Sequence, residues 1–350
     1  MILSYVKQKT AGLANLGNTC FMNACLQILA HTFELNEVVV KPSKFNKGTS
    51  DTQIMGEWRE LLVEMWRKKG GAPSVKNPSM SAVIQPRKFV FYVQQVARVK
   101  GRDLFAGHSQ NDFSEFLHFF VDCLHESLGR PVNMIIRGDV ANDTDAVALQ
   151  TYKMLQKDYG VKYSEVLSVF NGVIVSEIWS EDGAKRHSTK PETFFTLDLP
   201  LAPTLLDSFR GFTTGEVMQG DNAWLNEATG RKETVLKRLR FWSFPPVLVV
   251  VLKRFTNQGR KDGAFVQYPL QGLDLDEFKC GYKRIASVYD LYGVACHVGN
   301  AGGGHYYCHV LNSVTGVWHT YDDEAFAAVE DAQQLVSPHA YCLFYRLRAK

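Results

Sequence analysis

The chain has 350 residues, of which 45% are hydrophobic, and its formal net charge is +3 at pH 7. A hydrophobic fraction of this size supports a large buried core and excludes an intrinsically disordered chain. Because the basic residues are scattered along the sequence rather than clustered, nothing in the charge pattern points to a nucleic-acid partner.

The cysteines and the start of the chain bear on where the protein works. Its seven cysteines include no Cys-x-x-Cys pair, which argues against a disulfide framework and a cysteine-rich zinc site. No apolar run approaches the roughly 20 residues of a membrane helix, and the start of the chain is too short for a signal peptide. We expect an intracellular protein that needs no metal or cofactor, does not insert into membranes and is a monomer.

The first predicted helix runs from Thr19 to about Thr32. Apolar residues recur there at helical spacing, behind a threonine whose hydroxyl is able to cap the first turn. Cys20 is therefore expected at a helix N-terminus. The preceding segment, Gly12 to Thr19, is rich in glycine and asparagine and suits a loop with unusual backbone angles.

Four further segments precede or follow the main helical region. A weaker helical pattern covers Ile54 to Trp66, and a loop rich in Gly, Pro and Ser covers Gly70 to Ser81. A short helix is predicted over Arg87 to Val99. The acidic and polar stretch Gly138 to Asp145 is expected to be a surface insertion.

The strongest helical pattern covers Asp112 to Leu128, where apolar residues form a stripe along one face. Ser109 and Asp112 have the spacing of a capping box. Asp112 and Glu115 fall on the first turn, where two carboxylates are able to pair with arginines of a ligand. Simple capping of the helix is the alternative for these carboxylates.

From about Gly172 onward the pattern changes to short β-like runs. The clearest runs are Gly172 to Ile178, Phe194 to Leu199 and Val247 to Phe255. Because helices come first and strands later, the sequence predicts an α+β protein. A helical part should pack against an antiparallel sheet, with a cleft where the two meet.

Cys20 is the candidate nucleophile. A cysteine reacts as its thiolate, and a helix N-terminus and a nearby imidazolium both lower the thiol pKa. A buried, unreactive thiol is the alternative. Asn15 precedes Cys20 on the loop, and its amide is able to face the oxygen of an attacked carbonyl. The alternative for Asn15 is a turn residue that bonds its own backbone.

His305 is the candidate base, because it ends a glycine run and begins an apolar run that reads as a strand. The stretch Asn312 to Gly316 reads as a hairpin turn. If the turn centres near Val314, His305 lies opposite Asp323, and Asp322 is one residue away. A carboxylate would then orient the imidazole, although the spacing alone leaves the choice between the two aspartates open. An ordinary surface turn is the alternative.

Three other histidines lie near His305 in the sequence, namely His297, His309 and His319. They alternate along predicted strands without carboxylate or cysteine partners at ligand spacing. We therefore expect no zinc site there and interpret them as surface or hydrogen-bonded core histidines.

The segment Gly12 to Gln27 reads Gly-Leu-Ala-Asn-Leu-Gly-Asn-Thr-Cys-Phe-Met-Asn-Ala-Cys-Leu-Gln. It closely resembles the cysteine box of the ubiquitin-specific proteases. The resemblance implies that Cys20 is the nucleophile and that Asn15 stabilises the oxyanion.

A second part of the sequence resembles the histidine box and closing strand of the same family. It comprises Gly-Gly-His-Tyr at 303–306, then Trp318, Tyr-Asp-Asp at 321–323 and Ala-Tyr-Cys-Leu-Phe-Tyr-Arg at 340–346. The resemblance assigns the third position of the triad to Asp322. It leaves Asp323 as a helper behind the triad.

The segment Gly107 to Leu117 resembles the family box that contacts the arginine-containing tail of ubiquitin. This likeness implies a set of substrate contacts. The set comprises Gln110, Asp112, Glu115, Gly304 and Tyr306.

The resemblance covers nearly the whole chain and implies a papain-like cysteine protease domain over residues 10–348, shaped like a right hand. About residues 10–165 would form a helical thumb, about 170–245 β fingers, and about 246–348 mainly an antiparallel β palm. Family members often bind a structural zinc in the fingers through two Cys-x-x-Cys pairs. Here Trp179 to Asp182 and about Asp221 to Ala228 contain no cysteine, so the finger zinc is predicted to be absent.

The activity that the resemblance implies is hydrolysis of the amide or isopeptide bond after the C-terminal glycine of ubiquitin. The expected partners are ubiquitin and ubiquitinated proteins. A protease for another ubiquitin-like modifier and a non-catalytic ubiquitin-binding scaffold are the alternatives. The intact set of Cys20, His305 and Asp322 argues against the scaffold.

Overall fold

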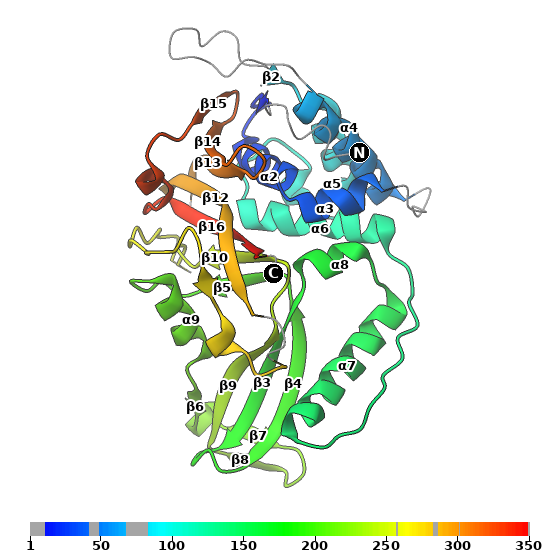
Figure 1. Ribbon diagram of the computed structural model, residues 1–350, viewed down its shortest axis with the longest axis vertical. Coiled ribbons are helices and arrows are strands. Elements are labelled where there is room, and N and C mark those ends of the chain that lie inside the picture. The colour runs from blue at the N-terminus through cyan, green and yellow to red at the C-terminus, as the bar shows by residue number, and fades with distance from the viewer. Residues whose placement is uncertain are drawn as a thin grey trace.

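The computed structural model describes residues 11–41, 49–67, 83–256, 258–282, 286–300 and 302–348. Helices dominate the first half of these residues and strands the second, as predicted (Figure 1). The predicted loop Gly70 to Ser81 lies outside the described residues. The α-helices are α2 (Cys20–Ala30), α3 (Phe33–Val40), α4 (Ser50–Arg67), α5 (Arg87–Val99), α6 (Phe113–Leu128), α7 (Asp143–Val161), α8 (Glu165–Phe170) and α9 (Leu205–Thr213).

Helix α2 is held by packing rather than by a cap. All of its residues are buried, and burial of this kind stabilises a short helix more than its own propensity does. The predicted capping role of Thr19 is wrong, because its side chain makes no cap hydrogen bond. Its hydroxyl instead accepts from the backbone N–H of Leu16 at 2.9 Å and donates to Asn15 Oδ1 at 3.3 Å. The threonine therefore shapes the loop before the helix.

Helix α6 begins at Phe113, and Asp112 is its N-cap. The Asp112 carboxylate accepts hydrogen bonds from the backbone N–H groups of Ser114 at 2.7 Å and Glu115 at 3.1 Å. The predicted capping box is therefore wrong, since Asp112 is the cap itself rather than the partner of a cap at Ser109. The helices predicted over Ile54 to Trp66 and Arg87 to Val99 are confirmed as parts of α4 and α5.

The larger sheet has eight strands in the order β15-β14-β13-β12-β16-β10-β5, with β11 beside β12. Every pair is antiparallel except β5 and β10, which run parallel, so the predicted antiparallel sheet is correct apart from that edge. Its strands are β5 (Thr196–Leu199), β10 (Val247–Leu252), β11 (Leu273–Asp274), β12 (Val288–Asn300), β13 (Gly303–Asn312), β14 (Val317–Asp322), β15 (Ala325–Ala328) and β16 (Ala340–Leu347).

Helix α2 lies directly on the larger sheet, against β12 and β13 (Figure 1). The approach is close at Gly293 of β12, where an added methyl group would sit 2.9 Å from the side chain of Ile28. Glycine is required there because no room remains for a Cβ atom. This packing brings the start of the chain against strands that come nearly 300 residues later.

The hairpin of β13 and β14 has a register one residue away from the predicted one. Cys308 pairs with Tyr321 and Asn312 with Val317, so the turn centres between Val314 and Thr315. The predicted pairing of His305 with Asp323 is therefore wrong, because the turn is longer by one residue than the assumed geometry.

A smaller sheet has the strand order β4-β3-β9-β6. Its strands are β3 (Gly172–Ser180), β4 (Arg186–Phe194), β6 (Glu216–Met218) and β9 (Val235–Ser243), followed outward by the hairpin β7 (Trp224–Asn226) and β8 (Arg231–Glu233). Helix α7 runs beside β4 (Figure 1). The predicted insertion Gly138 to Asp145 is exposed up to Asn142, and its last residues form the first turn of α7.

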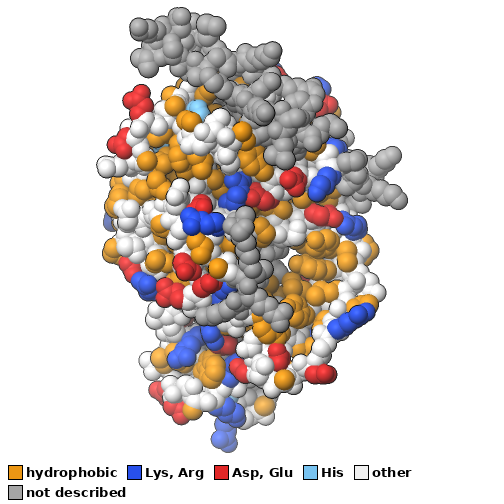
Figure 2. Space-filling view, viewed as in Figure 1, with side chains coloured by type: hydrophobic (Ala, Val, Ile, Leu, Met, Phe, Trp, Pro, Cys, Tyr) orange, Lys and Arg blue, Asp and Glu red, His pale blue; other side chains and the backbone are white. Residues whose placement is uncertain are grey.

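The surface carries charges of both signs. Over the described residues of the face in Figure 2, Lys and Arg side chains are interspersed with Asp and Glu. No helix in the described part of the chain combines the length and the apolar character that crossing a membrane requires.

Three buried histidines predict a loss of stability in mild acid. Burial lowers the pKa of His31, His297 and His309 to about 4 in each case. Between the unfolded pKa near 6.5 and this value, the unfolded chain takes up protons that the folded chain rejects, so stability falls as the pH drops. We expect the free energy of unfolding, measured in urea, to decrease from pH 7 to pH 5. If the pH is lowered further to 4, the total loss should reach up to about 3 kcal/mol for each histidine.

The variant His309→Gln should flatten this pH dependence, because it removes one of the three groups. A free energy of unfolding that stays constant between pH 7 and pH 5 would contradict the prediction.

Candidate active site

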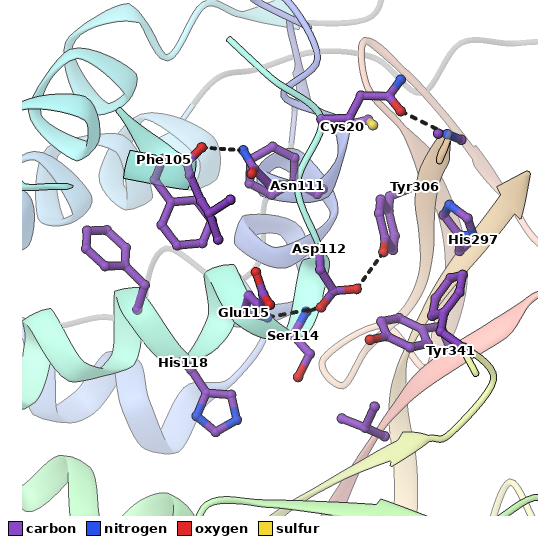
Figure 3. Close-up of a pocket in the computed structure, with 18 of the residues that line it drawn as sticks. Cys20, Phe105, Asn111, Asp112, Ser114, Glu115, His118, His297, Tyr306 and Tyr341 are labelled. Atoms are coloured by element: carbon purple, nitrogen blue, oxygen red, sulfur yellow. Dashed lines mark hydrogen bonds between the residues drawn. The ribbon is translucent and has the colours of Figure 1, made fainter. Parts of the chain in front are cut away.

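Cys20 is the first residue of α2 and lies on the wall of a cleft of about 930 Å³ (Figure 3). Its side chain is only 4% exposed. The cleft separates helix α6 from the ends of strands in the larger sheet, and the backbone N–H of Tyr306 in β13 points at the thiol. The structure therefore brings the predicted nucleophile against the strand that carries the predicted base.

The protonation of Cys20 depends on opposing influences. Burial raises the pKa of this thiol above its ordinary value, and the charge of Asp323 adds to that effect. The N–H groups of Tyr306 and Phe21 lower the pKa, as expected at a helix N-terminus. Because burial dominates, the helix end alone does not produce a thiolate, and a partner has to remove the proton.

His305 and Asp322 form the pair that the sequence predicted. The Nε2 atom of His305 lies 2.5 Å from Oδ1 of Asp322. This contact leaves the Nδ1 edge of the ring to face another group, as a base oriented by a carboxylate requires. The structure thus chooses Asp322 rather than Asp323 as the partner of the imidazole.

Asp323 has a different task, which is to hold Asn15. It follows β14 in a left-handed backbone conformation with φ of 49°, and this turns its carboxylate toward the loop before α2. Asn15 Nδ2 donates to Asp323 Oδ2 at 2.8 Å, while Asn15 Oδ1 accepts from the backbone N–H groups of Gly17 and Thr19, each at 3.1 Å. The side chain of Asn15 therefore bonds its own loop, as the alternative predicted, and keeps one amide hydrogen for another acceptor, so its oxyanion role stays a prediction.

Asn23 is a site residue to which the sequence analysis assigned no role. It lies on α2, is 2% exposed, and donates through Nδ2 to Asp323 Oδ1 at 2.8 Å. Burial raises the pKa of Asp323, whereas the amides of Asn23 and Asn15 oppose that rise. Asn23 could have been noticed in the sequence, because it is a polar residue among the apolar side chains of a buried helix. Buried polar groups usually have a hydrogen-bond partner.

Asp112 connects the two walls of the cleft. Besides capping α6, its carboxylate accepts a hydrogen bond through Oδ2 from the Tyr306 hydroxyl at 3.0 Å (Figure 3). Both carboxylate oxygens are thus occupied. Glu115, one turn along the same helix, is exposed to the cleft, and burial together with the charge of Asp112 raises its pKa.

Gln110 and Gly304 also meet across the cleft. Gln110 Oε1 accepts a hydrogen bond from the backbone N–H of Gly304 at 2.9 Å. All five predicted substrate contacts therefore line the same cleft as Cys20, and their roles stay predictions.

One group of side chains has the spacing needed to hold a metal ion. Among the described residues, His305, Asp322 and Asp323 are the one trio of such side chains close enough to share an ion, within 4.8 Å of one another. Their atoms already pair with each other or with asparagine amides, so we interpret them as a hydrogen-bonded set. His309 is a core histidine whose Nδ1 contacts Thr320 Oγ1 at 2.9 Å, as the alternative to zinc predicted.

A family model described as ubiquitin carboxyl-terminal hydrolase matches residues 11–345. The chain belongs to this family. It is 32% identical over 357 residues to ubiquitin carboxyl-terminal hydrolase 2 of Bos taurus, an alignment that covers 97% of this chain and 55% of that protein. It is 28% identical over 373 residues to ubiquitin carboxyl-terminal hydrolase 4 of Saccharomyces cerevisiae, covering 95% of this chain and 39% of that protein. The chain therefore spans about half or less of the length of these relatives.

A solved structure supports the family fold. A chain of the SAGA DUB module Ubp8/Sgf11/Sus1/Sgf73 bound to monoubiquitin has a TM-score of 0.72 and 22% identity, covering 99% of this chain and 70% of that one. This likeness confirms the predicted fold class, an α+β papain-like domain with the right-hand architecture of the family.

Proposed function

We propose that this chain is a thiol-dependent hydrolase that cleaves the amide or isopeptide bond after the C-terminal glycine of ubiquitin. The observation that carries the proposal is the 2.5 Å contact of His305 with Asp322, on a strand whose next residue, Tyr306, directs its N–H at the Cys20 thiol. Membership of the ubiquitin carboxyl-terminal hydrolase family supports the choice of substrate.

In the proposed reaction His305 takes the proton of Cys20, and the thiolate attacks the carbonyl carbon of the terminal glycine. The free amide hydrogen of Asn15 stabilises the developing oxyanion. His305 then protonates the departing lysine amine, which leaves a thioester between Cys20 and ubiquitin. Water, deprotonated by His305, hydrolyses the thioester and restores the thiol.

The tail of ubiquitin is proposed to lie in the cleft beside Cys20. Glu115 offers its exposed carboxylate to an arginine of the tail, whereas Asp112 acts mainly by fixing Tyr306. Gln110 and the backbone of Gly304 are proposed to contact the extended tail once their mutual hydrogen bond opens. The loop 256–263 and the tip of the β12–β13 hairpin at 299–304 are the proposed gates, and residues 257 and 301 lie outside the described part of the chain.

The proposed parts of the hand follow the boundaries expected from the sequence. About residues 10–165 are proposed to form the thumb, about 170–245 the fingers around the smaller sheet, and about 246–348 mainly the palm. We propose that the protein works as a monomer inside the cell, in the cytoplasm or nucleus. The seven cysteines, all of them free thiols, support an intracellular setting.

Activity probes built on ubiquitin and on other modifiers that end in Gly-Gly test the choice of substrate. We expect the ubiquitin probe to label the wild type and to leave Cys20→Ala unlabelled. Labelling by the probe of another modifier alone would show that this modifier, and not ubiquitin, is the substrate. Binding of ubiquitin without labelling would indicate a non-catalytic ubiquitin-binding scaffold.

Replacing Asn15 by alanine tests the oxyanion role. We expect kcat to fall by about 100-fold with little change in KM, because one preorganised donor is lost in the transition state only. Alkylation of Cys20 by iodoacetamide, a reaction without an oxyanion, should keep its rate. A kcat within twofold of the wild type would contradict the assignment.

A further inference from the structure

Helix α7 spans the distance between helix α6 and the smaller sheet (Figure 1). Its C-terminal half is fixed to the segment that leaves α6. Tyr163, just after the helix, exchanges two backbone hydrogen bonds with Arg130 at 2.7 and 2.9 Å. Lys162 Nζ forms an ion pair with Glu126 of α6 at 2.6 Å. This end of the helix is therefore anchored to the helical part of the molecule.

The N-terminal half of α7 is fixed to the smaller sheet. Arg186 of β4 donates through Nη1 to Asp143 Oδ2 at 2.7 Å and through Nη2 to Asp143 Oδ1. The hydroxyl of Tyr282 donates to Asp145, and the Tyr282 ring contacts Trp242 of β9 at a centroid distance of 5.5 Å. Hydrogen bonds from two separate segments thus hold the first turn of α7.

Arg186 is held in place from the sheet side by a buried carboxylate. Glu177 of β3 is 2% exposed and lies 3.5 Å from Arg186 Nη1, and it also accepts from Trp179 Nε1 at 3.2 Å. A buried carboxylate requires a cation or strong donors, so the guanidinium cannot leave without a large cost. The Arg186 side chain is 19% exposed and Asp143 is 72% exposed, so the ion pair lies at the surface while its arginine is fixed from the sheet side.

An apolar contact completes this junction. Val147 and Ala148 of α7 are buried against Val173, Val175 and Trp242 of the sheet. No cysteine occurs between Cys123 and Cys280, so the finger strands contain no thiolate for a zinc that would stiffen them. Order in this sheet must come from contacts of the kind just described.

We propose that Asp143, Arg186 and Tyr282 are positioning residues that clamp the smaller sheet to α7 and so set its distance from the catalytic cleft. The inference rests on the proposed function, in which the ubiquitin tail enters the cleft, and it adds that the smaller sheet contacts the folded body of ubiquitin. The clamp acts on the binding of whole ubiquitin and leaves the reacting groups untouched.

The double variant Asp143→Asn with Tyr282→Phe tests the clamp, because it removes the charge and the hydroxyl with almost no change in shape. We expect KM for a fluorogenic ubiquitin amide to rise by roughly five- to tenfold, the size of one or two lost polar contacts, with kcat within twofold. The kcat/KM for a short fluorogenic peptide that carries only the ubiquitin tail should not change. The single variant Asp143→Glu, which keeps the charge and the Tyr282 hydroxyl, should have a KM close to that of the wild type.

Glu277→Ala is the matched control, since it breaks an exposed ion pair with Arg210 of 3.1 Å that lies outside the smaller sheet. This variant should leave KM and kcat for the ubiquitin amide and kcat/KM for the tail peptide unchanged. Hydrogen exchange gives a readout that needs no substrate, and amides of residues 172–180 and 186–194 should exchange faster in the double variant. Unchanged exchange together with an unchanged KM would overturn the clamp. A wild type that fails to hydrolyse the ubiquitin amide would instead overturn the proposed function, and exchange would still report on the clamp.

Discussion

Replacing Cys20 by alanine is expected to lower kcat/KM for a fluorogenic ubiquitin amide by at least about 10³-fold, because the covalent route disappears with the sulfur. The fold should survive, since the side chain loses one atom at the edge of a cleft. The rate of amide hydrolysis and the melting temperature, measured on the same samples, check both expectations.

Cys25→Ala is the matched control for this experiment. Cys25 lies on the same helix, is fully buried, and burial raises its pKa well above the ordinary value. Its removal should cost some stability and leave kcat within about twofold, since the group touches no reacting atom. Equal rates for the wild type and Cys20→Ala would rule out the proposed nucleophile.

Replacing His305 by alanine should have a comparable effect, with a loss of about 10³-fold in kcat/KM. The cause is the environment of Cys20, where burial raises the thiol pKa above its usual range. Without a base, the thiolate fraction at pH 7 is smaller than for an ordinary cysteine, because burial raises the thiol pKa. Alkylation by iodoacetamide should therefore become slow at neutral pH in this variant and recover only at alkaline pH.

The control for His305 is His309→Gln, four residues along the same strand. This side chain faces Thr320 rather than the cleft, so alkylation of Cys20 should keep its wild-type pH profile. The alkylation rate of Asp322→Asn at pH 7 should lie between those of His305→Ala and His309→Gln. In this variant the imidazole remains but loses its orienting carboxylate. Fast alkylation at pH 7 in His305→Ala would contradict the pairing of thiol and imidazole.

The parts of the site that depend on local pattern were predictable from the sequence. Helix α2 and the hairpin of β13 and β14 are periodic segments with clear turn residues, so Cys20 and His305 became candidates together with the pairing of the two hairpin strands. The register of the hairpin was not predictable, because one extra residue in a turn is invisible to periodicity. Spacing left the choice between Asp322 and Asp323 open, the family resemblance assigned Asp322, and the structure places that carboxylate on the imidazole.

Contacts between distant segments lay outside the reach of sequence patterns. Thr19 and Asp112 illustrate this, since each has a short polar side chain suited to a cap and only Asp112 is used as one. Helix α7 has a weak apolar stripe, and its importance comes from Arg186 on a strand far along the chain. Propensity ranks what a residue is able to do, and packing selects among those options.

The bond between Asn15 and Asp323 joins residues 308 positions apart. A ribosome therefore releases the nucleophile long before it makes the hairpin that completes the site. While the chain is growing, Cys20 lacks both its proposed base and the bond that fixes Asn15, so a nascent chain does not yet hold the proposed catalytic set. The proposed site is therefore assembled only when the last strands dock, which ties it to the folding of both ends of the described chain.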